Sequence, residues 1–149
     1  MKPTPYRGPS SQFSAEDHIA RARQFRRGAH KLEDMEGAEP NWPKYALLGH
    51  AVELALKAVP KYFEQSRTYQ KPNAVEPANH DLVGQYEWAK LHGLASNAVV
   101  ETDLPVLSKL HEDHYARYPQ TLRPVPLPSG FDDLVDQIIA DVEKIMRLP

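Results

Sequence analysis

The chain has 149 residues, of which 41% are hydrophobic and 26% charged, with a formal net charge of -2 and no cysteine. These values are typical of one globular domain with a hydrophobic core. The lack of cysteine excludes disulfides, thiolate nucleophiles and Cys-ligated metal sites. No stretch approaches the roughly 18 apolar residues of a membrane span, and the N-terminus lacks the apolar run of a signal peptide. We therefore expect a cytoplasmic protein without membrane association.

The N-terminal region divides into a lead-in and a first helix. Residues 1–12 contain three prolines and predict a disordered segment, so the domain is expected to span residues 13–149. Ser14 and Asp17 have the spacing of a capping box, which predicts the start of a helix. Apolar residues at helical spacing continue this pattern, and we expect the helix to end near Gly37.

The outer side of this first helix carries the one dense basic surface in the sequence. Its members lie mostly at i, i+4 spacing and are Arg21, Arg23, Arg26, Arg27 and Lys31. Because the net charge gives no general attraction to nucleic acid, any such binding must come from a local patch of this kind. The pattern favours a solvated helix face, with phosphate binding as the alternative.

The second predicted helix, residues 43–64, is apolar on two opposite sides. Asn41 is expected to cap it, with Pro43 in its first turn. At 100° per residue, one apolar face contains Tyr45, Leu48, Val52, Leu56, Val59 and Phe63, and the other contains Leu47, Ala51, Leu54 and Ala58. A helix that is apolar on both sides needs neighbours on both sides, so we expect it at the centre of a bundle.

Three further helices are predicted after a long crossover loop at residues 66–79. The first runs from about His80 to His92, and Gly93 ends it. The next begins near Thr102 or Asp103, with Pro105 in its first turn, and stops at Pro119. Residues 120–128 then form an extended, proline-rich strap. Ser129 and the apolar residues from 131 to 145 predict the last helix. Strand-like alternation is absent, so the expected fold is an all-α, up-and-down bundle of about five helices.

A narrow polar stripe on the central helix is the most informative candidate site. His50, Glu53 and Lys57 lie on one side of it, with Glu53 four residues before Lys57. The structural interpretation is an i, i+4 ion pair. The functional interpretation is a polar groove formed with His114 and Arg117, in which these five residues bind phosphate or a nucleotide.

Metal, cofactor and nucleophile motifs receive little support. Two facing metal ligands on a helix need i, i+3 or i, i+4 spacing, and among the seven histidines only His111 and His114 have it. That pair could bind a divalent metal with a third ligand from another helix, but a hydrogen-bonded pair is favoured, so we expect neither a metal nor a cofactor. Glycine-rich phosphate loops and Gly-x-Ser-x-Gly are absent, and nothing marks a covalent nucleophile.

Three segments in this order resemble the HEPN (higher eukaryotes and prokaryotes nucleotide-binding) family. They are residues 45–58, with Glu-x-x-x-Lys at Glu53 and Lys57, residues 79–82, with His-Asp-Leu, and residues 116–119, with Arg-Tyr-Pro. The resemblance extends over about residues 14–148. It implies an α-helical bundle that commonly dimerises. Many members of the family are ribonucleases of toxin-antitoxin or defence systems, and others bind nucleotides or RNA, often beside a nucleotidyltransferase.

The ribonuclease branch of that family uses an arginine followed, after four to six residues, by a histidine late in the bundle. Arg117 has no histidine after it, whereas Arg23 and His30 have the spacing but lie on the first helix. The resemblance therefore predicts a non-catalytic homodimer that binds a nucleotide, RNA or a partner protein, such as a nucleotidyltransferase or an antitoxin. The alternatives are a metal-independent ribonuclease and a structural adaptor that uses its strap and long loop as contact surfaces.

Overall fold

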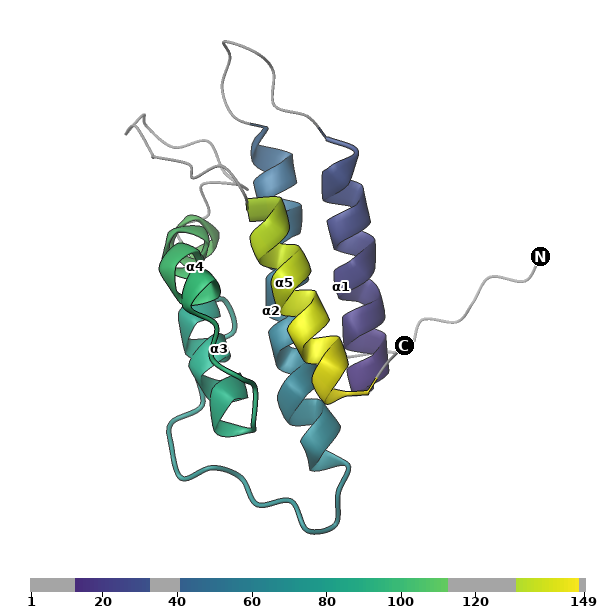
Figure 1. The fold of residues 1–149 in the computed structure, drawn as a ribbon, viewed down its shortest axis with the longest axis vertical. Coiled ribbons are helices and arrows are strands. Elements are labelled where there is room, and N and C mark those ends of the chain that lie inside the picture. Colours follow the sequence, from purple (N-terminus) through teal and green to yellow (C-terminus); the bar gives the residue numbers. More distant parts are fainter. Residues whose placement is uncertain (1–12, 33–40, 113–130, 148–149) are drawn as a thin grey trace, which may run out of the picture.

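The computed structural model of the chain describes residues 13–32, 41–112 and 131–147, and these segments are entirely helical or irregular (Figure 1). Their five helices are α1 (Ala15–His30), α2 (Trp42–Glu64), α3 (Leu82–Leu91), α4 (Ala98–Glu112) and α5 (Phe131–Ile145). The expected all-α bundle is therefore confirmed. None of these helices combines the length and the apolarity that crossing a lipid bilayer requires.

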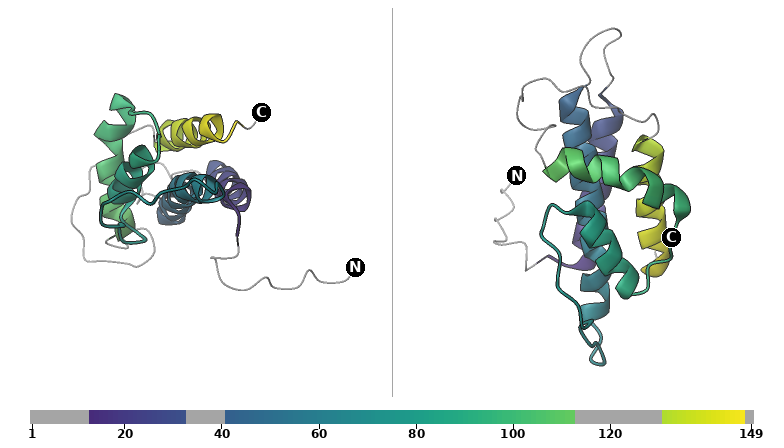
Figure 2. Two further views of the ribbon diagram at one scale, coloured as in Figure 1. Left: turned by 90° about the horizontal axis from the view of Figure 1, so that it is seen from below. Right: turned by 90° about the vertical axis from the view of Figure 1, so that its left-hand side faces the viewer.

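Helix α2 lies at the centre of the bundle, as its two apolar faces predict. It packs against each of the other four helices. Leu48, Val52, Leu56 and Val59 on one face and Ala51 on the other are completely buried. Helices α1 and α5 lie alongside α2, whereas α4 runs across the bundle (Figure 2). The crossing brings the C-terminal part of α4 against the polar stripe of α2.

Helix α1 begins as predicted but ends earlier than expected. The Ser14 side chain accepts a hydrogen bond from the Asp17 backbone while the Asp17 carboxylate accepts one from the Ser14 backbone, which completes the capping box. At the other end, the amides of Lys31 and Leu32 bond to carbonyls three residues back instead of four. This tightening closes the helix at His30, so the expected end near Gly37, which itself lies outside the described residues, is wrong.

Helix α4 begins before the predicted position. The Asn97 side chain accepts hydrogen bonds from the amides of Val99 and Val100, at 3.0 and 3.3 Å, and so starts the helix at Ala98 rather than at Thr102 or Asp103. Pro105 then lies inside the helix rather than in its first turn. The predicted lead-in at residues 1–12, the helix end at Pro119, the strap at 120–128 and the cap at Ser129 lie outside the described residues.

The start of α3 is held by two helices at once. Asp81 caps it by accepting from the Gly84 amide at 2.9 Å. The buried Ser108 hydroxyl of α4 accepts from the amide of Leu82 at 3.1 Å. Because both α4 and the helix's own cap accept hydrogen bonds from backbone amides of its first turn, α3 is fixed relative to α4. His80, immediately before the cap, is thereby placed beside α2.

Candidate functional site

The polar stripe of α2 leads to a group of ionisable side chains, which we call the histidine-glutamate cluster: His50, Glu53, His80 and His111. Its centre is the Glu53 carboxylate, only 9% exposed. The Glu53 Oε1 atom lies 2.8 Å from His80 Nδ1 and 3.7 Å from His111 Nε2. Lys57 Nζ, one turn further along α2, lies 3.8 Å from the same oxygen. The cluster therefore joins groups from α2, α4 and the segment before α3.

The rings of the cluster are packed against one another and against the helix backbone. His111 meets the ring of His50 edge-on, with centroids 5.2 Å apart, and that of His80 in the same way at 5.4 Å. The His50 ring also stacks on Phe25 of α1, with centroids 5.6 Å apart. A Cβ added to Gly49 would lie 2.5 Å from His111 Nδ1, so the absence of a side chain there lets the ring approach the backbone of α2.

The neighbours of Glu53 favour its ionised form. Burial alone would raise the pKa of this carboxyl, but the His111 ring, the Lys57 ammonium group and the hydrogen bond with His80 together lower its pKa below the usual value. At 3.7 Å the effect of His111 is electrostatic rather than that of a well-formed hydrogen bond. The core of the bundle therefore contains a carboxylate that is kept charged by cationic and hydrogen-bonding neighbours.

His111 has an incomplete hydrogen-bonding arrangement. Its side chain is 2% exposed, and its Nε2 atom has no hydrogen-bond partner among the described residues. An unpaired buried polar atom is unfavourable by about 1–3 kcal/mol, so native proteins contain few of them. The unpaired atom lies in the histidine-glutamate cluster, on the side of the ring that faces Glu53.

The residues proposed from sequence are only partly brought together. His50 and Glu53 belong to the cluster, and Lys57 forms the expected i, i+4 ion pair with Glu53, at a long distance of 3.8 Å. Arg117 and His114, which were expected to complete a phosphate-binding groove, lie outside the described residues. The sequence therefore identified the helix and the carboxylate of the cluster.

Two members of the cluster were not identified as site residues from sequence. In the sequence, His80 stands out only as part of a His-Asp-Leu motif, and His111 only through its spacing to His114. The i, i+3 spacing of His50 and Glu53 places both side chains on one side of a helix. This spacing indicates a site on α2 but does not indicate which residues of other helices join it. Nothing in the sequence shows that α4 crosses at that position.

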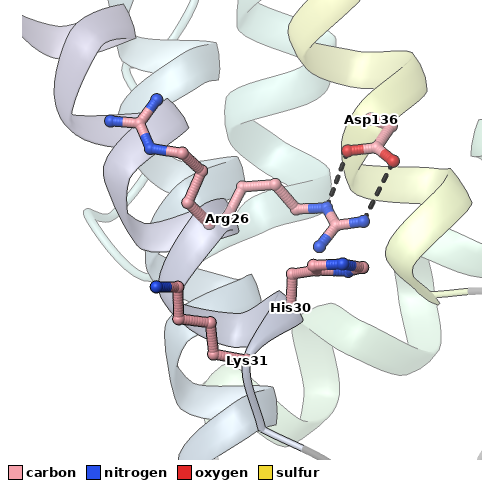
Figure 3. A pocket seen from close by; sticks show the side chains of 5 residues that line it. Arg26, His30, Lys31 and Asp136 are labelled. Atoms are coloured by element: carbon pink, nitrogen blue, oxygen red, sulfur yellow. Dashed lines mark hydrogen bonds and ion pairs between the residues drawn. The ribbon is translucent and has the colours of Figure 1, made fainter.

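A second candidate site lies on the basic surface of α1, where α5 supplies acidic partners. The Arg23 guanidinium donates to Glu143 at 2.9 Å. Arg26 makes two hydrogen bonds to Asp136, at 2.6 and 3.0 Å (Figure 3). These carboxylates raise the pKa of both arginines through hydrogen bonding and charge. Part of the predicted basic surface thus serves to attach α1 to α5.

Two of the remaining cations of this surface, Arg27 and Lys31, line an open hollow at the C-terminal end of α1. It has a volume of about 360 Å³ and is lined by Arg26, Arg27, His30, Lys31 and Asp136. Figure 3 shows Arg26 directed toward Asp136 and Lys31 directed away from it. Within the described ranges, no ion pair involves Arg27, His30 or Lys31. The lining of the hollow therefore has basic side chains that are not neutralised by its one carboxylate, Asp136.

None of the protein-family models, curated proteins or solved structures compared with this chain matches it.

Proposed function

We propose that this chain is a non-catalytic HEPN-like domain that binds single-stranded RNA through the basic hollow of α1. The observation that carries the proposal is the unequal use of the basic surface. Carboxylates of α5 engage Arg23 and Arg26, whereas Arg27 and Lys31 are exposed and have no carboxylate partner in the described part of the chain. Cations that are not already paired can exchange bound counterions for phosphates, which is the main source of affinity for nucleic acids.

The form of the hollow also suits a phosphate-bearing chain. Its volume of about 360 Å³ is at the lower end of the range of small-molecule pockets, and it is open to solvent, so a strand can enter and leave along the surface. Arg27 and Lys31 are one helical turn apart, which allows both to face the same strand. A nucleotide offers the same phosphate chemistry with fewer charges and is expected to bind more weakly.

A purely structural role for these cations makes a different prediction. Arg27 and His30 are in the last turn of α1, where positive charge stabilises a helix by about 0.3–1 kcal/mol through the macrodipole. If this is their only role, removing the Arg27 charge lowers stability slightly and has no effect on RNA. The two roles are therefore separated by measuring stability and binding on the same variant.

The decisive experiment is a salt titration of RNA binding. Fluorescence anisotropy with a labelled single-stranded RNA, in EDTA, should show binding by the wild type and a loss of affinity in the double variant Arg27→Ala/Lys31→Ala. Since each phosphate contact contributes about -0.7 to the slope of log K against log salt, the slope should fall by about 1.4. No binding by wild type, or an unchanged slope in the variant, would refute the proposal.

The chain offers a control of equal charge and spacing at Arg67 and Lys71, of which Lys71 pairs with Glu76. These residues have the same Arg-x-x-x-Lys spacing and are exposed, but they lie in the loop between α2 and α3, away from the hollow. The double variant Arg67→Ala/Lys71→Ala removes the same charge and should bind RNA nearly as well as wild type. An equal loss in both double variants would show that net charge, not the hollow, determines the affinity.

The ribonuclease alternative depends on Arg23 and His30, and the Arg23 guanidinium is engaged by Glu143. Incubating the same RNA with the protein in EDTA and analysing it on a gel tests this alternative, and the RNA should remain intact.

The resemblance to the HEPN family also supports a homodimer. Light scattering of the purified chain measures its mass directly and so tests this part of the proposal.

A further inference from the structure

Three members of the histidine-glutamate cluster have the arrangement of metal ligands. One ligand atom from each of His50, Glu53 and His111 lies within 4.8 Å of the other two. His50 and Glu53 come from successive turns of α2, and His111 comes from the last turn of α4, so the donors converge from two helices that pack against each other. Helix bundles commonly build metal sites in this way, from side chains of facing helices.

The unpaired nitrogen of His111 independently points to a ligand. Its Nε2 atom is buried without a hydrogen-bond partner in the described segments and lies 3.7 Å from Glu53 Oε1. That separation is too long for a hydrogen bond. Donors bound to one tetrahedral ion at about 2.0–2.2 Å lie about 3.3–3.6 Å from each other, so a small adjustment would place an ion between these two atoms.

The surroundings of His111 restrict how its ring can move. The backbone of Gly49 blocks the ring on the Nδ1 side, because even a Cβ atom there would come within 2.5 Å of it. The rings of His50 and His80 pack edge-on against it. These contacts keep Nε2 directed toward the carboxylate, and such positioning of ligands before an ion arrives favours binding.

His80 completes the arrangement from outside. Its Nδ1 atom lies 2.8 Å from Glu53 Oε1, the type of hydrogen bond that orients a ligating carboxylate. The His80 side chain is 47% exposed, so this side of the cluster is open to solvent. Water or a ligand could therefore occupy a fourth coordination position there, as in zinc sites with three protein ligands.

We propose that His50, Glu53 and His111 bind a divalent transition-metal ion of the Zn²⁺ class, which joins α2 to α4. Two imidazoles and one carboxylate suit Zn²⁺ and its Co²⁺ substitute better than they suit Ca²⁺ or Mg²⁺, which prefer oxygen ligands. This site is distinct from the basic hollow of α1, and RNA binding there is measured in EDTA, so either proposal can fail while the other holds.

The test uses the full chain after removal of metal with EDTA and dialysis. Calorimetric titration with ZnCl₂ should show one ion bound per chain, and Co²⁺ should give the visible absorption of a tetrahedral complex. A hundredfold excess of Zn²⁺ over its Kd should raise the Tm by about 5–10 °C, because the ion binds only the folded chain. No binding and no Tm shift in the wild type would overturn the proposal.

Variants identify the ligands. Glu53→Gln and His111→Gln should each reduce Zn²⁺ affinity at least about 100-fold and remove the Tm shift. Because both side chains are buried, His50→Gln, at a partly exposed position, provides a variant that folds if the other two do not. The control is His30→Gln, which removes an exposed histidine of α1 and should bind Zn²⁺ as the wild type does. Wild-type affinity in His50→Gln would show that the ion binds elsewhere and would overturn the proposal.

Discussion

The Cα atom of Gly49 faces the imidazole ring of His111 so closely that a methyl group at position 49 would lie 2.5 Å from Nδ1 and 3.1 Å from Cγ. Atoms of one side chain on α4 thus approach the backbone of α2 directly. The contact explains how a helix that crosses the bundle can bring a buried histidine to the carboxylate of Glu53, which is one turn further along α2.

Gly49→Ala is expected to destabilise the fold by about 1–3 kcal/mol, because the added methyl group must displace either the His111 ring or the backbone of α4. Urea denaturation monitored by circular dichroism measures the change. The matched control is Gly28→Ala in α1, where the added Cβ would make an ordinary contact of 3.5 Å with Leu47 Cδ1. Because alanine favours a helix over glycine, this control should gain about 0.5–1 kcal/mol. Equal effects at the two positions would contradict the role assigned to the Gly49 contact.

Glu53 should make the stability of the chain sensitive to acid. Its folded-state pKa is lowered below 4.5, so the unfolded chain takes up the proton first. The stabilisation is present above the unfolded-state value and is lost as pH falls through the folded-state value. Denaturation midpoints should therefore decrease below about pH 4.5, and Glu53→Gln should flatten this part of the profile while lowering stability at pH 7.

The control for that experiment is Glu143→Gln, which removes the carboxylate that pairs with Arg23 on the surface. A partly exposed ion pair contributes about 0–1 kcal/mol, so this variant should change the acid profile much less. If both glutamine variants gave the same profile, the acid sensitivity would come from the total charge of the chain and not from the buried carboxylate.

Several features of the fold were predictable because they depend on local patterns. The capping box at Ser14, the helix-ending glycine at Gly93, which has a positive φ, and the two apolar faces of α2 are each encoded within a few turns of chain. Each is present in the structure. The prediction for the start of α4 is wrong because proline is common in the first turn of a helix, so that Pro105 predicts a later start. The side-chain cap from Asn97 started the helix earlier.

The candidate site was less predictable because it depends on the crossing of helices. His50 and Glu53 are adjacent on one helix, and their proximity follows from the sequence. The contact of Glu53 with His111 depends on the angle at which α4 crosses α2, and its contact with His80 depends on how α3 is attached to α4 through Ser108. No local pattern in one sequence determines these angles.

The attachment of α3 to α4 makes Ser108 a sensitive position. Its buried hydroxyl accepts hydrogen bonds from the amides of Leu82 and Val83, at 3.1 and 3.4 Å. Ser108→Ala leaves amides of the first turn of α3 without this partner, at an expected cost of about 1–3 kcal/mol. Hydrogen exchange should show faster exchange at Leu82 and Val83. A control variant, Thr102→Ala, removes an exposed hydroxyl of the same helix and should change stability by less than about 0.5 kcal/mol.

His18 should produce a second pH dependence, near neutral pH. Burial lowers the pKa of this histidine, and the nearby Lys61 and Lys57 lower it further, against the opposing effects of the Ser14 carbonyl and Asp17. Since the unfolded chain binds the proton more readily, stability is greatest above the ordinary value of 6.5 and decreases as pH falls from there toward the folded-state pKa.

Urea denaturation at pH values between 5 and 8 tests this expectation. His18→Gln removes the titrating ring, so the difference in unfolding free energy between wild type and variant should favour wild type most at the alkaline end and shrink as pH falls. His30→Gln, which changes an exposed histidine of the same helix, serves as the control. The comparison isolates His18 because the other histidines, including those of the histidine-glutamate cluster, are the same in wild type and His18→Gln. A difference that stays constant across this range would mean that His18 binds protons equally in the folded and unfolded chains, contrary to the effect expected of its burial.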